Sequence, residues 1–118
     1  MSKSVLRQFS ETFTTYQEKF GLNGYQIYFQ TAPIGDSYAN IFINQDGMVA
    51  TVTLNNAVSK EDKSHQDIHK NAKHEALHLL VGRFSDYAQS RYVTRADITE
   101  AEEELVRRLD TLIPDIKV

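Results

Sequence analysis

Apolar side chains recur at spacings of three and four over residues 3–20, which is the period of an amphipathic helix. Gly21 follows, where a left-handed helix cap is expected. The pattern predicts an N-terminal helix that packs an apolar, largely aromatic face into the core. The residues of that face are Val5, Leu6, Phe9, Phe13, Tyr16 and Phe20.

Three short segments with strand character follow this helix. Residues 25–29 are aromatic and β-branched, residues 38–43 form a second segment, and residues 48–54 alternate between two faces. Asp46 and Gly47 predict a hairpin turn between the second and third segments, because Gly tolerates positive φ. We expect a small, mostly antiparallel three-stranded sheet.

A long helix is predicted next. Ser59 can cap its N-terminus, with Asp62 three residues further on, and nothing interrupts the helix before Gly82. We expect an irregular stretch over residues 83–93. The helix contains the histidines considered below.

Thr94 and Asp97 repeat the capping pattern and predict the start of a last helix. This helix should end near Ile113, because Pro114 disfavours helical geometry in the residue before it. The predicted order of elements is α-β-β-β-α-α, which is an α+β fold.

Length and composition limit the class of protein. The 118 residues suit a single domain over 1–118, and 41% apolar residues suit a globular core. The chain has no cysteine, which excludes disulfides and Cys-type zinc sites and fits a reducing, cytoplasmic location. The net charge of −3 lacks the basic surplus of nucleic-acid binders, and no apolar run approaches the ~20 residues of a membrane span. We therefore expect neither nucleic acid nor membrane as a partner, and any metal site must use His and carboxylate ligands.

The segment 74–78 reads His-Glu-Ala-Leu-His, an HExxH motif inside the predicted long helix. Residues four apart share one helix face, so His74 and His78 can reach one metal ion. At about 100° per residue, Glu75 lies about 100° from His74 and about 60° from His78. That is where a general base acting on a zinc-bound water should lie.

A solvated polar stripe is the alternative explanation of this motif. The apolar neighbours argue against it, because two His and a Glu in apolar surroundings are costly unless they are paired or bind metal. These neighbours are Ala72, Ala76, Leu77, Leu79, Leu80 and Val81.

His65 and His69 form a second pair at spacing four, among Lys, Gln and Asp residues. His69 is about half a turn out of phase with His78, so this pair should face away from the first. We interpret it as part of a solvated helix face rather than as a second metal site.

A catalytic zinc site needs a third protein ligand. No His follows His78, and Val81 and Phe84 occupy the Gly and His positions of the longer HExxHxxGxxH motif. The third ligand should therefore be a carboxylate. Asp86 and Asp97 are candidates, but Asp86 lies in a presumed loop and Asp97 resembles a helix cap.

The last helix is a better source of this carboxylate. Helical phase places Glu102 about 30° from the centre of its apolar stripe and Glu103 near the stripe's edge, whereas Glu100 and Glu104 point outward. We expect either Glu102 or Glu103 to be the third ligand. The alternative for Glu103 and Glu104 is surface pairing at spacing four, with Arg107 and Arg108.

The combination of HExxH with a Glu on a later helix resembles the gluzincin branch of zinc metallopeptidases. The chain is similar to small HExxH proteins encoded by tailed phages and prophages, through residues 74–80, 91–94 and 101–109. The resemblance implies a minimal zincin-like core: a small sheet, an active-site helix and a C-terminal glutamate helix. In these proteins an acidic pair precedes a Val-x-x-Leu run, which Glu102 and Glu103 match together.

The leading interpretation is a zinc-dependent metallopeptidase with one Zn²⁺ per chain, Glu75 as general base and a peptide or protein substrate. Tyr87, Arg91 and Tyr92 are candidate donors to the oxyanion. The alternative is a metal-holding zincin-like module that binds a host or phage protein without catalysis. The intact Glu75 favours the enzyme, and the lack of a second subdomain to form the other wall of the cleft favours the binding module.

Overall fold

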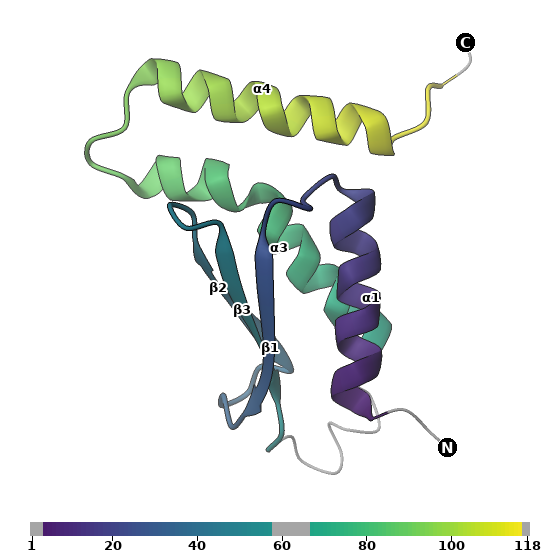
Figure 1. The fold of residues 1–118 in the computed structure, drawn as a ribbon. Coiled ribbons are helices and arrows are strands. Elements are labelled where there is room, and N and C mark those ends of the chain that lie inside the picture. The colour runs from purple at the N-terminus through teal and green to yellow at the C-terminus, as the bar shows by residue number, and fades with distance from the viewer. Residues whose placement is uncertain (1–3, 58–66, 117–118) are drawn as a thin grey trace.

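A computed structural model describes residues 4–57 and 67–116 (Figure 1). The predicted helix start at Ser59 and Asp62 lies outside these residues, as does His65. The expectation of one uninterrupted helix from there to Gly82 is wrong, because the helix that carries the histidines begins at Ile68 with Asp67 as its extended N-cap. The described elements are α1 (Val5–Lys19), β1 (Gln26–Ala32), β2 (Ala39–Asn44), β3 (Val49–Asn55), α3 (Ile68–Gln89) and α4 (Arg95–Leu112). The α+β class is confirmed.

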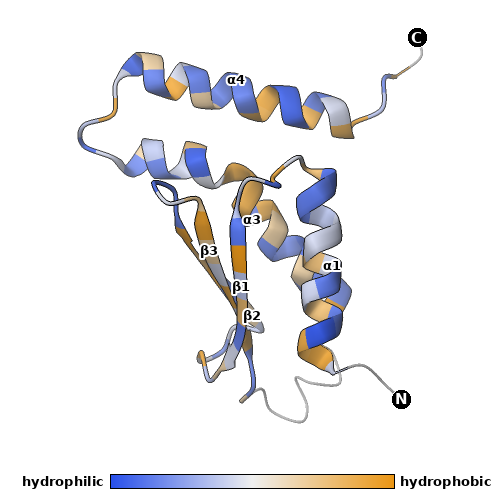
Figure 2. Ribbon diagram, in the orientation of Figure 1, coloured by the Kyte–Doolittle hydropathy of each residue, from blue (hydrophilic) through white to orange (hydrophobic). Residues whose placement is uncertain are grey.

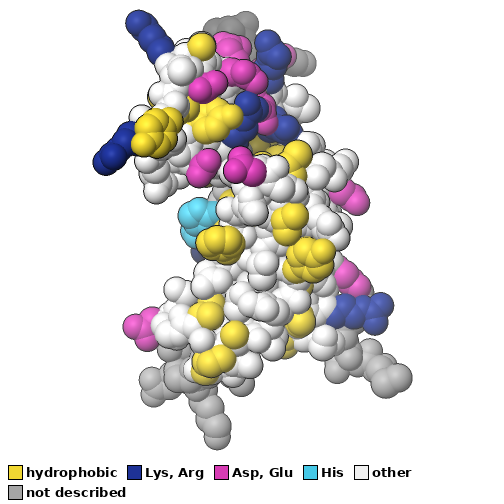
Figure 3. Space-filling view, turned by 60° about the vertical axis from the view of Figure 1, so that its left-hand side comes forward, with side chains coloured by type: hydrophobic (Ala, Val, Ile, Leu, Met, Phe, Trp, Pro, Cys, Tyr) yellow, Lys and Arg dark blue, Asp and Glu magenta, His cyan; other side chains and the backbone are white. Residues whose placement is uncertain are grey.

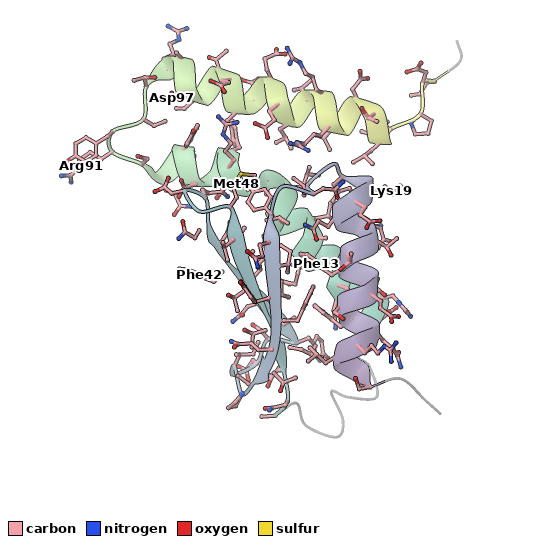
Figure 4. All side chains as sticks on the ribbon, in the orientation of Figure 1. Phe13, Lys19, Phe42, Met48, Arg91 and Asp97 are labelled. Carbon is pink, nitrogen blue, oxygen red and sulfur yellow. The ribbon has the colours of Figure 1, made fainter. Side chains whose placement is uncertain are left out.

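Helix α1 lies within the predicted segment 3–20, and it begins at Val5, after an N-cap at Ser4 that was not predicted. The Ser4 hydroxyl accepts a hydrogen bond from the backbone N–H of Arg7 at 3.2 Å, and Gly21 after the helix has a φ of +73°. Phe9 and Phe13 are fully buried. Phe13 points from α1 toward the sheet, where its ring meets Phe29 of β1 edge to face at 5.4 Å (Figure 4). The aromatic face therefore joins α1 to the sheet.

The three strands form a sheet in the order β1-β3-β2. β2 and β3 are antiparallel, joined through the predicted turn at Asp46 and Gly47, whereas β1 pairs with β3 in parallel. The expectation of a mostly antiparallel sheet is therefore wrong. The loop over residues 33–38 carries the chain past β3 to its far edge, so successive strands β1 and β2 are not neighbours.

Helices α1 and α3 lie on one face of the sheet, and the core forms between them (Figure 1). Ala50, Val52 and Leu54 of β3 are buried in this core. Apolar residues concentrate on the strands and on the middle of α3 (Figure 2). The other face is open, and Phe42 of β2 is 75% exposed there.

Helix α3 continues seven residues beyond Gly82, to Gln89. The predicted break at Gly82 and the irregular stretch from residue 83 are therefore wrong over residues 83–89. The glycine serves close packing instead, because a β-carbon there would lie 2.9 Å from both Ile43 and Gln45 of the β2–β3 hairpin.

Helix α4 has the predicted ends. The Thr94 hydroxyl accepts a hydrogen bond from the Asp97 backbone N–H, and the Asp97 carboxylate accepts one from the Thr94 N–H, which forms a capping box. The cap at the other end is Ile113, directly before Pro114. α4 packs against α3 (Figure 1). Within the described residues, no helix has the length and apolar character needed to cross a membrane.

Candidate metal centre

The two histidines of the HExxH motif turn toward each other on the exposed side of α3. Their Nε2 atoms lie 3.2 Å apart, and the rings meet edge to face with centroids 4.8 Å apart. Both side chains are exposed. The helix therefore directs two imidazole nitrogens to one point at the surface.

This separation fits a shared zinc ion. With Zn–N distances of about 2.0–2.1 Å and tetrahedral angles, two His nitrogens on one zinc lie about 3.3 Å apart. The 3.2 Å between the Nε2 atoms of His74 and His78 is close to that value. The two histidines thus have the chemistry and the spacing of a ligand pair.

Glu75 is buried on the adjacent face of the helix, with 6% of its surface exposed. Burial raises the pKa of its carboxyl group to about 7, because desolvation disfavours the charged form. A cation held by the neighbouring histidines would act in the opposite direction and favour the carboxylate. The surroundings of Glu75 therefore suit a group that accepts and releases a proton.

Two hollows lie between α3 and the edge strand β2, one at each histidine. The first, of about 300 Å³, is lined by residues that include Tyr38, Lys70, Asn71, His74 and Glu75, and we call it the Lys70 hollow. The second, of about 210 Å³, is lined by residues that include Ile41, Ile43, Gln45, His78 and Asp86, and we call it the Asp86 hollow.

The histidine pair thus lies beside an edge strand with a recess on either side. Histidine surface is visible in the indentation beneath the α4 part of the molecule (Figure 3). A larger hollow of about 930 Å³ runs along α4 and is lined by neither histidine.

His69 is directed away from the site. Its Nδ1 lies 2.7 Å from the hydroxyl oxygen of Thr12 on α1, on the other side of α3. The prediction that His69 does not join His74 and His78 is confirmed, although the ring contacts α1 rather than solvent alone.

The predicted third ligands are not brought to the histidines. Glu102 and Glu103 are both exposed on α4. Across residues 4–57 and 67–116, no group of three His, Asp or Glu side chains is placed to hold a metal ion. The expectation that Glu102 lies on the buried stripe of α4 is wrong, and the identity of a third ligand stays a prediction.

Other glutamates of α4 face α3 instead, in an ion-pair network. Arg83 of α3 pairs with Glu104 and with Glu100, and Arg108 pairs with Glu104 at 3.1 Å. The side chain of Glu104 is only 34% exposed, so its predicted outward orientation is also wrong. The pairing of Glu104 with Arg108 at spacing four is confirmed. Glu102 is left on the exposed side.

The two aspartate candidates have other positions. Asp97 is engaged in the capping box of α4. Asp86 is helical rather than in a loop, and it is exposed at the rim of the Asp86 hollow. It therefore shares a recess with His78 but does not complete a group of three ligands with the histidines.

The predicted oxyanion donors also lie elsewhere. Tyr87 is engaged with Arg83, whose Nη2 lies 3.4 Å from its hydroxyl oxygen. Arg91 and Tyr92 lie in the connection between α3 and α4, beyond Gln89, which is about 16 Å along the helix axis from His78 (Figure 4). Tyr92 is 87% exposed.

Two polar residues that the sequence did not single out line the Lys70 hollow beside His74 and Glu75. These are Tyr38 and Asn71, and the Asn71 Nδ2 is buried without a hydrogen-bond partner. Asn71 stands one turn before Glu75, and that spacing is the only sequence signal for it. Tyr38 stands 36 residues before His74 and reaches the site only through the fold.

No protein-family model matches this chain, and no curated protein or solved structure is significantly similar to it. The resemblance to gluzincins therefore rests on the sequence motifs alone.

Proposed function

We propose that the chain is a zinc-dependent peptidase whose metal is held by His74 and His78. The observation that carries the proposal is the 3.2 Å separation of their Nε2 atoms, beside a buried Glu75. HExxH sites of this kind combine two histidine ligands with a glutamate base.

The chemistry divides between the metal and the protein. Zinc, when bound, would lower the pKa of a coordinated water from 15.7 to about 7. Glu75 takes a proton from the attacking water and passes it to the leaving amine nitrogen. Its burial beside the two histidines supports this role, because desolvation raises the pKa of its carboxyl group to about 7, where it can accept and release a proton.

The edge of the sheet offers a place for the substrate backbone. Asn55 N donates a hydrogen bond to Tyr38 O, so alternate residues of β2, beginning with Asn40, direct their backbone groups at β3. Ala39, Ile41 and Ile43 consequently direct theirs at the open edge, beside the two hollows. An extended peptide can pair with these groups and pass the histidines, which supports peptide as the substrate class.

The test is the hydrolysis of a peptide library by the zinc-loaded chain and by its Glu75→Gln variant. The substitution keeps the size of the side chain and removes its basicity, so turnover should fall by about 10²–10⁴-fold while zinc stays bound. Glu18→Gln, an exposed position on α1, is the matched control and should cleave as the unmodified chain does. Equal rates for the unmodified chain and Glu75→Gln would contradict the mechanism.

The second candidate is a metal-holding module that binds a protein without cleaving it. The observation in its favour is that Glu102 and Glu103 are exposed on α4 and, among the described residues, form no metal-binding group with the histidines. Zinc binding with no hydrolysis across the library would favour this candidate over the peptidase.

A further inference from the structure

The two hollows that flank the histidines differ in the exposed charged side chain that lines each of them. Lys70 lines the one beside His74, and Asp86 lines the one beside His78. Both side chains are exposed, and neither forms an ion pair with another described residue. Their charges are therefore available to a bound molecule.

The charges lie at opposite ends of the β2 edge. The Lys70 hollow is lined by Ala39 at the start of β2, and the Asp86 hollow by Ile43 and Gln45 at its end. α3 therefore runs beside β2 in the same direction. The separation along the edge is about six residues, from Ala39 to Gln45.

A second carboxylate lies at the Asp86 end of the edge. Asp46 of the β2–β3 turn lines a shallow recess together with Asp86, so two carboxylates lie at the far end of the edge. Lys73 does not contribute at the near end, because its ammonium lies 5.9 Å from the ring centroid of Tyr16 on α1. Of the exposed charged side chains that line these recesses, the lysine thus lies at one end of the groove between β2 and α3 and the two aspartates lie at the other.

This polarity favours one direction and one charge pattern in an extended peptide. Antiparallel pairing, the more stable of the two arrangements, places the N-terminal part of the peptide at the Asp86 end. A basic side chain there would face Asp86 and Asp46, and an acidic side chain in the C-terminal part would face Lys70. The parallel arrangement of the same peptide would bring like charges together.

We propose that the groove between β2 and α3 binds an extended peptide antiparallel to β2, with a basic side chain about three residues before the histidines and an acidic one about three residues after them. Lys70 and Asp86 are then specificity-determining residues for side chains within the peptide. This inference rests on the proposed function for its substrate class, but binding alone can test it.

The experiment uses two fluorescent peptides of identical composition. In one, Lys precedes Glu by six positions around a neutral centre, and in the other the two residues are exchanged. Binding is measured by fluorescence anisotropy with the full-length Glu75→Gln chain loaded with zinc, so that cleavage does not interfere. Exposed charge pairs have modest effects, so the Lys-first peptide should bind about three- to tenfold tighter at low salt.

The decisive variant is Lys70→Glu combined with Asp86→Lys, which should invert the preference. The matched control, Lys73→Glu with Asp110→Lys, changes the same charges away from the groove and should retain it. Equal binding of both peptides, no binding of either, or an unchanged preference in the decisive variant would overturn the inference. An inverted preference without hydrolysis by the unmodified chain would support the inference and count against the peptidase proposal alone.

Discussion

Gly82 of α3 lies directly against Ile43 of β2, so close that a β-carbon on the glycine would be 2.9 Å from the Cδ1 of the isoleucine. The contact joins the helix that carries the histidines to the strand that borders them. It also accounts for a glycine in the interior of a helix, where its propensity is unfavourable by about 1 kcal/mol relative to alanine.

Enlarging Gly82 should therefore separate the hairpin from α3. We expect Gly82→Leu to lower the free energy of unfolding by about 1–3 kcal/mol, the usual cost of overpacking. Gly82→Ala should cost less, because the atoms it meets are the ends of flexible side chains and helix propensity improves. Urea denaturation measures both. Ala88→Leu, at an exposed position of α3, is the control, and a loss there equal to that of Gly82→Leu would refute the packing role.

The capping box of α4 makes stability depend on pH. Hydrogen bonds from Thr94 lower the pKa of Asp97 in the folded chain. A lowered folded pKa means that the Asp97 carboxylate stabilises the fold above its unfolded pKa of about 3.9, and that this contribution is lost as pH falls through the folded pKa.

The free energies of unfolding of the unmodified chain and of Asp97→Ala should accordingly differ most above about pH 5 and become similar in acid. The measurement is urea denaturation at a series of pH values. In a Thr94→Ala background the same substitution should have a smaller effect that still depends on pH, because the Thr94 hydroxyl is lost while the backbone N–H of residue 94 still donates to the Asp97 carboxylate. A difference that grows as pH falls would contradict the assignment.

Local sequence patterns were sufficient for most elements of this fold. The 3.6-residue periodicity with Gly21 predicts α1, the cap at Thr94 predicts the start of α4, and the alternation over residues 48–54 predicts β3. The parallel pairing of β1 with β3 was not accessible, because strand order depends on contacts far apart in the sequence. The helix break predicted at Gly82 was wrong for the same reason, because the residue that Gly82 packs against, Ile43, lies 39 residues earlier in the sequence.

The candidate site was likewise predictable in part. Two histidines at spacing four in a helix must share a face, so the geometry of His74 and His78 could be predicted. The orientation of Glu102 could not be predicted, because the apolar stripe of α4 gives no sign that Glu104 forms an ion pair with Arg83 of another helix. Tyr38 meets the site only through the packing of α3 beside β2, whereas Lys70 stands one turn before His74 on the same helix.

The position of α4 leads to a prediction about the third ligand. Because Glu102 and Glu103 are exposed and join no metal-binding group, Glu102→Ala and Glu103→Ala should each leave zinc affinity within about threefold of the unmodified chain. Glu104→Ala serves as a control that removes a carboxylate already paired with Arg83 and Arg108. Competition with a chelating dye measures the affinity. A loss of about tenfold or more in one of the first two variants would show that α4 supplies a ligand when zinc is bound.

The most direct test of the proposed zinc site is titration of the purified chain with zinc by calorimetry, with His78→Ala and His69→Ala in parallel. We expect about one zinc ion per unmodified chain, because the Nε2 atoms of His74 and His78 converge on one point. His78→Ala should abolish this binding, whereas His69→Ala, which removes a ring that contacts Thr12 instead, should retain it. No zinc binding by the unmodified chain, or equal loss in both variants, would contradict the metal centre.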